Sequence, residues 1–146
     1  IFPSGTDAIA IFSAENSYVS PNWYPTKIKT HRHVPTWNYQ VVHLKGRMTF
    51  DESKKAKLSV VGTLTKLYER MHFGDDEWKM SDAPKDFIEH MLDNIVAFEF
   101  DVKSIIAKSK LSQNRETKDY DSVKQMMKDQ KKNHLFEAMD NIQKSD

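Results

Sequence analysis

Cysteine is absent from the 146-residue chain. Its absence excludes disulfides, thiolate metal ligands and cysteine nucleophiles, and it fits a reducing compartment such as the cytoplasm. Glycine is scarce, and none of the four glycines belongs to a phosphate-binding loop or a dinucleotide fingerprint. The formal net charge is only +1, so the sequence shows no electrostatic footprint for nucleic acid. No apolar run approaches the roughly 20 residues of a membrane helix.

The composition that remains is typical of a soluble globular domain. Hydrophobic residues make up 38% of the chain and charged residues 29%, and the length is sufficient for one domain with its own hydrophobic core. The first residue is Ile1 rather than Met, and an apolar pattern follows almost at once. We therefore expect that the natural beginning of the protein is missing from this chain.

The first third of the chain predicts short extended segments. Residues 7–13 read as a buried strand with Ile9, Ile11 and Phe12 as core candidates. Residues 13–17 form a turn-like cluster, and the extended pattern resumes at 18–19, which predicts a hairpin. Two prolines, at positions 21 and 25, exclude long regular structure there, and a basic loop is expected over 27–33.

Residues 36–50 are the longest strand candidate. Trp37 and Tyr39 alternate with Asn38 and Gln40, so the two pairs should face opposite sides of a sheet. Gly46 would permit a bulge or a sharp bend in the middle of this strand. A long bent strand is what a small β-barrel requires.

The rest of the chain predicts helices and a further strand region. Residues 51–73 should form a helix capped by Asp51 or Ser53, with an apolar face. A second helix should be capped by Ser81 or Asp82, with Pro84 in its first turn. Its expected buried stripe consists of Phe87, Ile88, Met91, Leu92 and Ile95.

Strict alternation predicts a half-buried strand over 96–102, with another strand over 105–111. Residues 112–119 read as a polar loop, and 119–142 as a helix broken near 131–134. With few candidate βαβ units, this order of elements predicts an α+β fold, an antiparallel sheet or barrel with peripheral helices.

Three polar-aromatic clusters could bind a ligand: Ser20–Pro25, Val34–Tyr39 and Lys110–Arg115. Tryptophan and tyrosine offer flat faces, the amides and hydroxyls offer hydrogen bonds, and lysine and arginine offer partners for phosphate. A planar, polar, phosphorylated ligand needs all three kinds of group. For any single cluster, however, the more common reading is that the aromatics close a core edge and the polar residues satisfy turns.

The histidines and lysines carry weaker signals. His31 and His33 lie on one side of an extended segment, but no third metal ligand has a recognisable spacing, so a solvated basic loop is favoured. His43 is better explained as a satisfied core or interface histidine than as a catalytic base. Lysines of the last helix are interleaved with aspartates, which favours a solvated face over a DNA-binding surface. Spacing alone supports no catalytic group.

The segments YVSPNWYP, VPTWNYQVVHLKGRMTF, SDAPKDFIEHMLDNIVAFEFDV and KLSQNR together resemble the PaiB family of FMN-binding transcriptional regulators. The resemblance spans about residues 7–115. It implies a split β-barrel of the pyridoxamine-phosphate-oxidase-like type, with FMN sites at the interface of a homodimer. It also implies that the start of the barrel precedes Ile1, with residues 1–115 forming a partial FMN-binding domain and 116–146 a helical extension.

The resemblance places Thr36, Trp37, Asn38 and Tyr39 at a strand entrance beside the flavin cleft or the dimer interface. The cofactor-binding candidates from all three clusters are Ser20, Trp23, Tyr24, Thr36, Trp37, Asn38, Tyr39, Lys110, Gln113, Asn114 and Arg115. No metal ligand and no catalytic residue is implied.

Three functions remain open from the sequence. The favoured one is a PaiB-like, FMN-binding repressor of transcription, for which DNA is implied by the resemblance alone. The second is a flavin-dependent oxidoreductase, in which the cofactor would supply the redox chemistry. The third is a dimerisation scaffold without cofactor, in which Trp23, Trp37 and Tyr39 are interface anchors.

Overall fold

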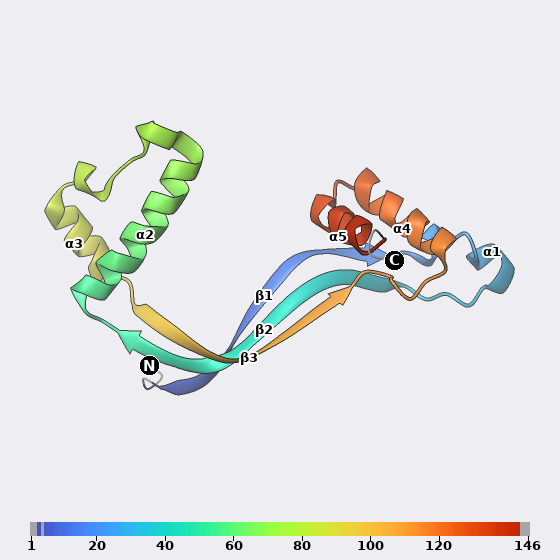
Figure 1. The fold of residues 1–146 in the computed structure, drawn as a ribbon, viewed down its shortest axis with the longest axis horizontal. Helices are drawn as coiled ribbons and strands as arrows, with labels where there is room; N and C mark the ends of the chain where they lie inside the picture. The colour runs from blue at the N-terminus through green and yellow to red at the C-terminus, as the bar shows by residue number, and fades with distance from the viewer. Residues whose placement is uncertain (1–2, 4, 144–146) are drawn as a thin grey trace. The chain divides into compact units, whose positions relative to one another are not determined.

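The computed structural model describes Pro3 and residues 5–143. Three strands form one antiparallel sheet in the order β1-β2-β3: β1 (Thr6–Val19), β2 (Thr36–Asp51) and β3 (Ala97–Lys110). Strand β2 is central, and helices follow the strands in the chain (Figure 1). The predicted α+β class is confirmed, and the three described strands form an open sheet.

The chain divides into two compact units, and both contain parts of the strands. Unit 1 comprises Ile1–Ala8 and Gly46–Lys103. Unit 2 comprises Ile9–Lys45 and Ser104–Asp146.

Unit 1 contains the helices α2 (Lys54–Phe73) and α3 (Lys85–Asp93) and the short 3-10 helices η2 (Gly74–Asp76) and η3 (Met80–Asp82). Of the two caps predicted for α2, Ser53 is correct, since its side chain accepts from the Ala56 N–H. Asp51 instead ends β2 and accepts from the Ser53 N–H at 2.8 Å. Hydrogen bonds from the side chain and backbone of Ser53 lower the pKa of the Asp51 carboxyl.

The second helix of unit 1 begins later than predicted. Pro84 occupies the cap position of α3, whereas Ser81 and Asp82 belong to η3. Proline disfavours helical backbone in the residue before it, which separates the two elements. In the predicted stripe only Leu92 is buried, while Phe87 and Met91 are exposed.

No residue of α2 is buried, and its large apolar side chains Leu64, Leu67, Tyr68 and Met71 are exposed. Helices α2 and α3 are in contact, and an ion pair between Lys54 and Glu89 joins them. The Lys57 ammonium also donates to the Leu92 carbonyl at 3.0 Å. The apolar face that the sequence predicts on α2 therefore remains uncovered within the described residues.

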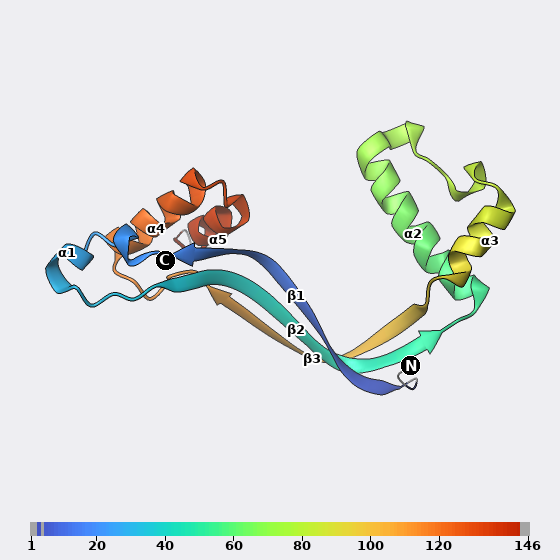
Figure 2. The ribbon, with the colours of Figure 1, turned by 180° about the vertical axis from the view of Figure 1, so that it is seen from behind.

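Unit 2 holds the main hydrophobic core. The helices α4 (Thr117–Asp129) and α5 (Asn133–Gln143) pack against each other over one face of the strands, as both views show (Figures 1 and 2). The 3-10 helix η1 (Pro21–Trp23) packs on α4, and α1 (Lys27–Thr30) lies in the expected basic loop. The core consists of Val19, Tyr24, Leu111, Tyr120, Val123, Met127, Leu135 and Met139.

The predicted hairpin at residues 13–17 is wrong, because β1 continues through this segment. Within this segment, Glu15 contacts the start of the last helix. Its carboxylate accepts from the Leu135 N–H at 3.3 Å and forms an ion pair with Lys132 at 3.7 Å. Tertiary pairing therefore overrides local turn preference. The core prediction for Ile9, Ile11 and Phe12 is also wrong, since these side chains are 55%, 61% and 59% exposed.

The two strands expected at 96–102 and 105–111 are one continuous strand, β3. Several of its apolar side chains are exposed, including Phe98, Val102 and Ile106. In contrast, the strand predicted over 36–50 is confirmed as β2, and the predicted break in the last helical segment is confirmed between α4 and α5.

Candidate ligand-binding site

The entrance of β2 directs its side chains to two different environments, as strand alternation requires. Asn38 is fully buried toward the helices. Its amide oxygen accepts from the Ser112 hydroxyl at 3.0 Å, and its amide nitrogen lies 3.8 Å from the Met139 sulfur. Asn38 therefore anchors the strand to the chain after β3 and to α5.

The neighbours of Asn38 project from the opposite side of β2. Trp37 is 51% exposed and meets Tyr18 edge to face, with ring centroids 5.8 Å apart. The Lys108 ammonium lies 5.8 Å from the centroid of the Tyr39 ring. We call Tyr18, Trp37, Tyr39 and Lys108 the aromatic face. It combines flat apolar surfaces with one cation.

A cavity of about 460 Å³ opens beside this face. Its lining comes from neighbouring parts of β1 and β2: Ser13, Ala14, Asn16, Trp37, Tyr39, Gln40 and Val41. The lining is mainly apolar with a few amide and hydroxyl groups, which is the usual character of a small-molecule site.

A second cluster joins two of the predicted segments. The Arg115 guanidinium lies 4.7 Å from the centroid of the buried Tyr24 ring, and the Tyr24 and His33 rings are 4.9 Å apart. An Arg115 nitrogen also approaches His33 Nδ1 at 3.5 Å. We call Tyr24, His33 and Arg115 the arginine cluster.

The hydrogen bonds of Thr26 indicate the tautomer of His33. The Thr26 hydroxyl donates its only proton to Asp119 Oδ2 at 2.5 Å, so it can only accept from His33 Nε2, which lies 2.8 Å away. The proton of the neutral imidazole is then on Nε2, and Nδ1 is left as an acceptor toward Arg115. His33 thus helps to orient the guanidinium.

The remaining predicted residues form hydrogen bonds that fix the backbone around the two clusters. Lys110 donates to the Thr36 hydroxyl, which joins the end of β3 to the start of β2. Gln113 accepts from the Leu111 N–H at 2.7 Å and donates to the Ser109 carbonyl at 2.8 Å.

Ser20 caps η1 by accepting from the Asn22 N–H at 3.2 Å. Trp23 packs against the core, and Asn114 is exposed. The predicted set therefore divides between the aromatic face, the arginine cluster and residues that fix the surrounding backbone.

Sequence reasoning missed several contributors. Tyr18 and Lys108 lie in segments that the sequence predicts as extended, but the pairing of β1 and β3 with β2, which brings them to Trp37 and Tyr39, is not visible in the sequence. Asp119 and Thr26 are 93 positions apart, and no local pattern connects them. His33 was assigned to a solvated loop, but it is only half exposed and contacts Thr26 and Arg115.

The described residues form neither a candidate metal site nor a membrane-spanning helix. No three histidine, aspartate or glutamate side chains in Pro3 and 5–143 are grouped so that they could hold a metal ion. Over the same residues, no helix has both the length and the apolar character needed to cross a bilayer.

Comparison with known proteins identifies relatives for most of the chain. A family model described as "Putative FMN-binding domain" matches residues 2–104. The chain is 36% identical over 123 residues to "Protease synthase and sporulation protein PAI 2" of Bacillus subtilis, a match covering 84% of this chain and 55% of the relative.

Fungal proteins are also similar. An uncharacterised protein of Saccharomyces cerevisiae is 41% identical over 59 residues, which cover 39% of this chain and 34% of the yeast protein. An uncharacterised protein of Emericella nidulans is 27% identical over 126 residues, which cover 80% of this chain and 50% of the fungal protein. The chain thus spans about half the length, or less, of these curated relatives. The matched segment includes the entrance of β2, and on these matches the chain belongs to the PaiB family.

Proposed function

We propose that this chain is the flavin-binding part of a PaiB-like regulatory protein and that FMN binds at the aromatic face. The observation that carries the proposal is the cavity of about 460 Å³ beside Trp37 and Tyr39, within a segment that matches an FMN-binding family. Aromatic rings stack well on planar heterocycles such as isoalloxazine. The residues present therefore fit the ring system of the cofactor.

The phosphate of FMN requires cationic or hydrogen-bonding partners. Lys108 stands over Tyr39, and Lys110 and Arg115 follow at the end of β3. We assign the phosphate to Arg115. Among the described residues its guanidinium contacts the Tyr24 ring and His33, which leaves several of its five N–H donors for a ligand.

Bound FMN would supply a redox-active, light-absorbing group to the protein. Trp37 and Tyr39 would hold its ring, and the amide of Asn16 in the cavity wall would offer hydrogen bonds to its polar edge. His33 would act as a positioning residue for Arg115. Among these groups we assign no catalytic acid or base, and a ligand-sensing role is the reading we favour, with repression of transcription inferred from the family.

We also propose that the complete protein closes this sheet into a split barrel and forms a homodimer in the cytoplasm. The support is the uncovered apolar surface of unit 2, where Trp37 and Tyr18 remain exposed on a three-stranded sheet. Exposed aromatics of this kind commonly become anchors at an interface. In this view residues 1–115 form part of the FMN-binding domain, and 116–146 form a helical extension.

An FMN titration followed by flavin fluorescence tests the proposal, on this chain and on a form extended to the length of its relatives. We expect Trp37→Ala and Arg115→Ala to weaken FMN binding by about tenfold or more. Trp78→Ala is the matched control, because Trp78 is an exposed tryptophan in unit 1, outside the aromatic face. It should bind FMN like the parent protein.

Absence of FMN binding in both forms would contradict the proposal. Equal affinity of the Trp37→Ala and parent proteins for FMN would contradict the placement of the flavin ring.

Size-exclusion chromatography with light scattering on the same samples tests whether the protein is a dimer. Arg115→Ala should leave the dimer intact while weakening FMN binding, whereas Trp37→Ala should affect both.

A further inference from the structure

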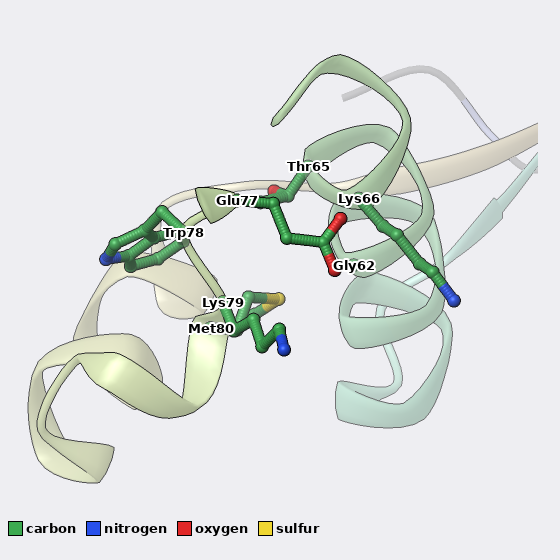
Figure 3. Close-up of a pocket in the computed structure, with 7 residues that line it drawn as sticks. All are labelled: Gly62, Thr65, Lys66, Glu77, Trp78, Lys79 and Met80. Atoms are coloured by element: carbon green, nitrogen blue, oxygen red, sulfur yellow. The ribbon is translucent and has the colours of Figure 1, made fainter. Parts of the chain in front are cut away.

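A separate cavity of about 380 Å³ lies entirely within unit 1, between α2 and the segment Glu77–Met80. It is lined by Gly62, Thr65, Lys66, Glu77, Trp78, Lys79 and Met80, which Figure 3 shows as sticks. No residue of the aromatic face or the arginine cluster takes part in it. The proposed flavin site therefore does not account for this cavity.

Glu77 gives the cavity its distinctive chemistry. Its side chain extends from the segment toward α2 (Figure 3), and its Oε2 atom is buried without a hydrogen-bond partner among the described residues. A buried carboxylate oxygen without a donor is energetically costly, so such an atom beside an open cavity indicates that a donor comes from outside the chain. An ammonium group is the strongest small donor of this kind.

The two lysines make a simple cation a poor ligand. Lys66 and Lys79 line the same cavity, and no ion pair joins either of them to Glu77 within Pro3 and 5–143. Their positive charges would repel a ligand that carried only ammonium groups, but they would attract a carboxylate. A ligand that satisfies all three side chains must carry charges of both signs.

The rest of the lining suits a short apolar spacer. Gly62 has no side chain, and a Cβ at this position would lie 3.6 Å from the Met80 sulfur. The thioether of Met80 and the indole of Trp78 offer apolar contact, and the Thr65 hydroxyl adds one polar group. Methylene groups between the two charged ends of a ligand would therefore meet a compatible surface.

We propose that this cavity binds a small zwitterion with a primary ammonium and a carboxylate, such as a free amino acid. The ammonium would donate to Glu77, and the carboxylate would lie between Lys66 and Lys79. Binding would be independent of the FMN proposal, because none of the residues involved belongs to the flavin site.

The test is isothermal titration calorimetry with a series of unbranched ω-amino acids from glycine to 6-aminohexanoate, on the full chain. Butyrate and n-butylamine are the matched controls, since each keeps one charged end of 4-aminobutyrate and lacks the other. We expect at least one amino acid to bind, and both single-charge compounds to bind about tenfold or more weakly. Equal binding of butylamine or butyrate, or no binding by any member, would overturn the proposal.

Two variants then test which protein side chain contacts the ammonium of the ligand and which contacts its carboxylate. Glu77→Gln keeps the size of the side chain and removes its charge, and it should weaken zwitterion binding by about tenfold. Lys79→Met keeps most of the apolar stem, and it should weaken zwitterion binding while improving the relative affinity of butylamine. Far-UV circular dichroism confirms that each variant is folded. Unchanged affinity in a folded Glu77→Gln protein would overturn the proposal, and an unchanged FMN titration would show that the flavin site is separate.

Discussion

Thr26 and Asp119 are joined by two hydrogen bonds although 93 positions separate them in the chain. The Thr26 N–H donates to Asp119 Oδ1 at 3.0 Å, and its hydroxyl donates to Oδ2 at 2.5 Å. Both residues are buried, with Asp119 only 2% exposed. This pair ties the loop after η1 to the first turn of α4, and it also holds the hydroxyl that accepts from His33.

Replacement of Asp119 by alanine should therefore destabilise unit 2 strongly. The Thr26 N–H would remain buried without an acceptor and its hydroxyl would lose the carboxylate, which together cost about 3 kcal/mol of unfolding free energy. Urea denaturation followed by circular dichroism measures the change. The control is Asp129→Ala at the exposed end of α4, for which we expect a change below about 0.5 kcal/mol. Similar losses in both variants would contradict the role assigned to Asp119.

The same substitution should alter the arginine cluster. Without Asp119, the Thr26 hydroxyl is free to donate to His33 Nε2, and the imidazole can then carry its proton on Nδ1, facing Arg115. The ¹⁵N chemical shifts of the His33 ring distinguish the two tautomers. We expect the Nε2-protonated form in the parent protein and a mixture in Asp119→Ala. A parent protein with the proton on Nδ1 would contradict the inferred network.

The sequence predicted much of β2 and the helices because their patterns are strongly periodic. Trp37, Asn38 and Tyr39 were placed on alternating faces, and the structure has this arrangement. The prediction failed in β1, where turn-favouring residues at 13–17 pair with β2 and contact α5. Local propensity could not reveal a partner helix more than 100 residues later in the chain.

The candidate site was predictable only in part. The sequence predicts Tyr24 and Arg115 as binding residues from their chemical type, and the structure brings them together with His33. The contacts of Thr26 with Asp119, and of Gln40 with Ser109 and His134, depend on tertiary packing across long separations. No spacing rule in a single sequence encodes such contacts.

Two glycines should respond in opposite directions to alanine. A Cβ at Gly46 would lie 2.3 Å from the backbone oxygen of Asp101 on β3, so Gly46→Ala should force the strands apart and cost about 2–3 kcal/mol. Close approach of β2 and β3 is therefore a further reason for glycine at this position, beside the bulge or bend that the sequence predicts. Gly62 lies inside α2, where only the Met80 sulfur is near. Gly62→Ala should stabilise the helix by about 0.5–1 kcal/mol. Thermal and urea denaturation measure the stability of both variants. A Gly46→Ala protein that is more stable than Gly62→Ala would contradict both predictions.

The hydroxyls of two buried tyrosines provide a second matched comparison. Tyr24 has a buried hydroxyl without a partner among the described residues, whereas the Tyr120 hydroxyl donates to the Met139 carbonyl at 2.7 Å. Tyr24→Phe should therefore be neutral or stabilising by up to about 1 kcal/mol, and Tyr120→Phe should cost about 1 kcal/mol. Urea denaturation of both variants makes the comparison. A large loss in Tyr24→Phe would mean that its hydroxyl has a partner, such as a bound water or a second protein chain.

The ion pair between Lys54 and Glu89 predicts a specific pH response in unit 1. The hydrogen bond and charge of Lys54 are the main causes that lower the pKa of the Glu89 carboxyl, with a smaller contribution from Lys85. Because the pKa of Glu89 is lower in the folded protein than in the unfolded chain, the ion pair stabilises the folded protein at pH values above the ordinary glutamate pKa of about 4.3. This stabilisation is lost as the pH falls through the pKa of Glu89 in the folded protein.

Carboxyl-carbon NMR during a pH titration measures the pKa of Glu89 directly. We expect Lys54→Met to raise the pKa of Glu89 toward the ordinary value, and Lys55→Met, next to it in the sequence, to leave it unchanged. An equal shift in both variants would mean that the effect comes from the net charge of α2 and not from the ion pair.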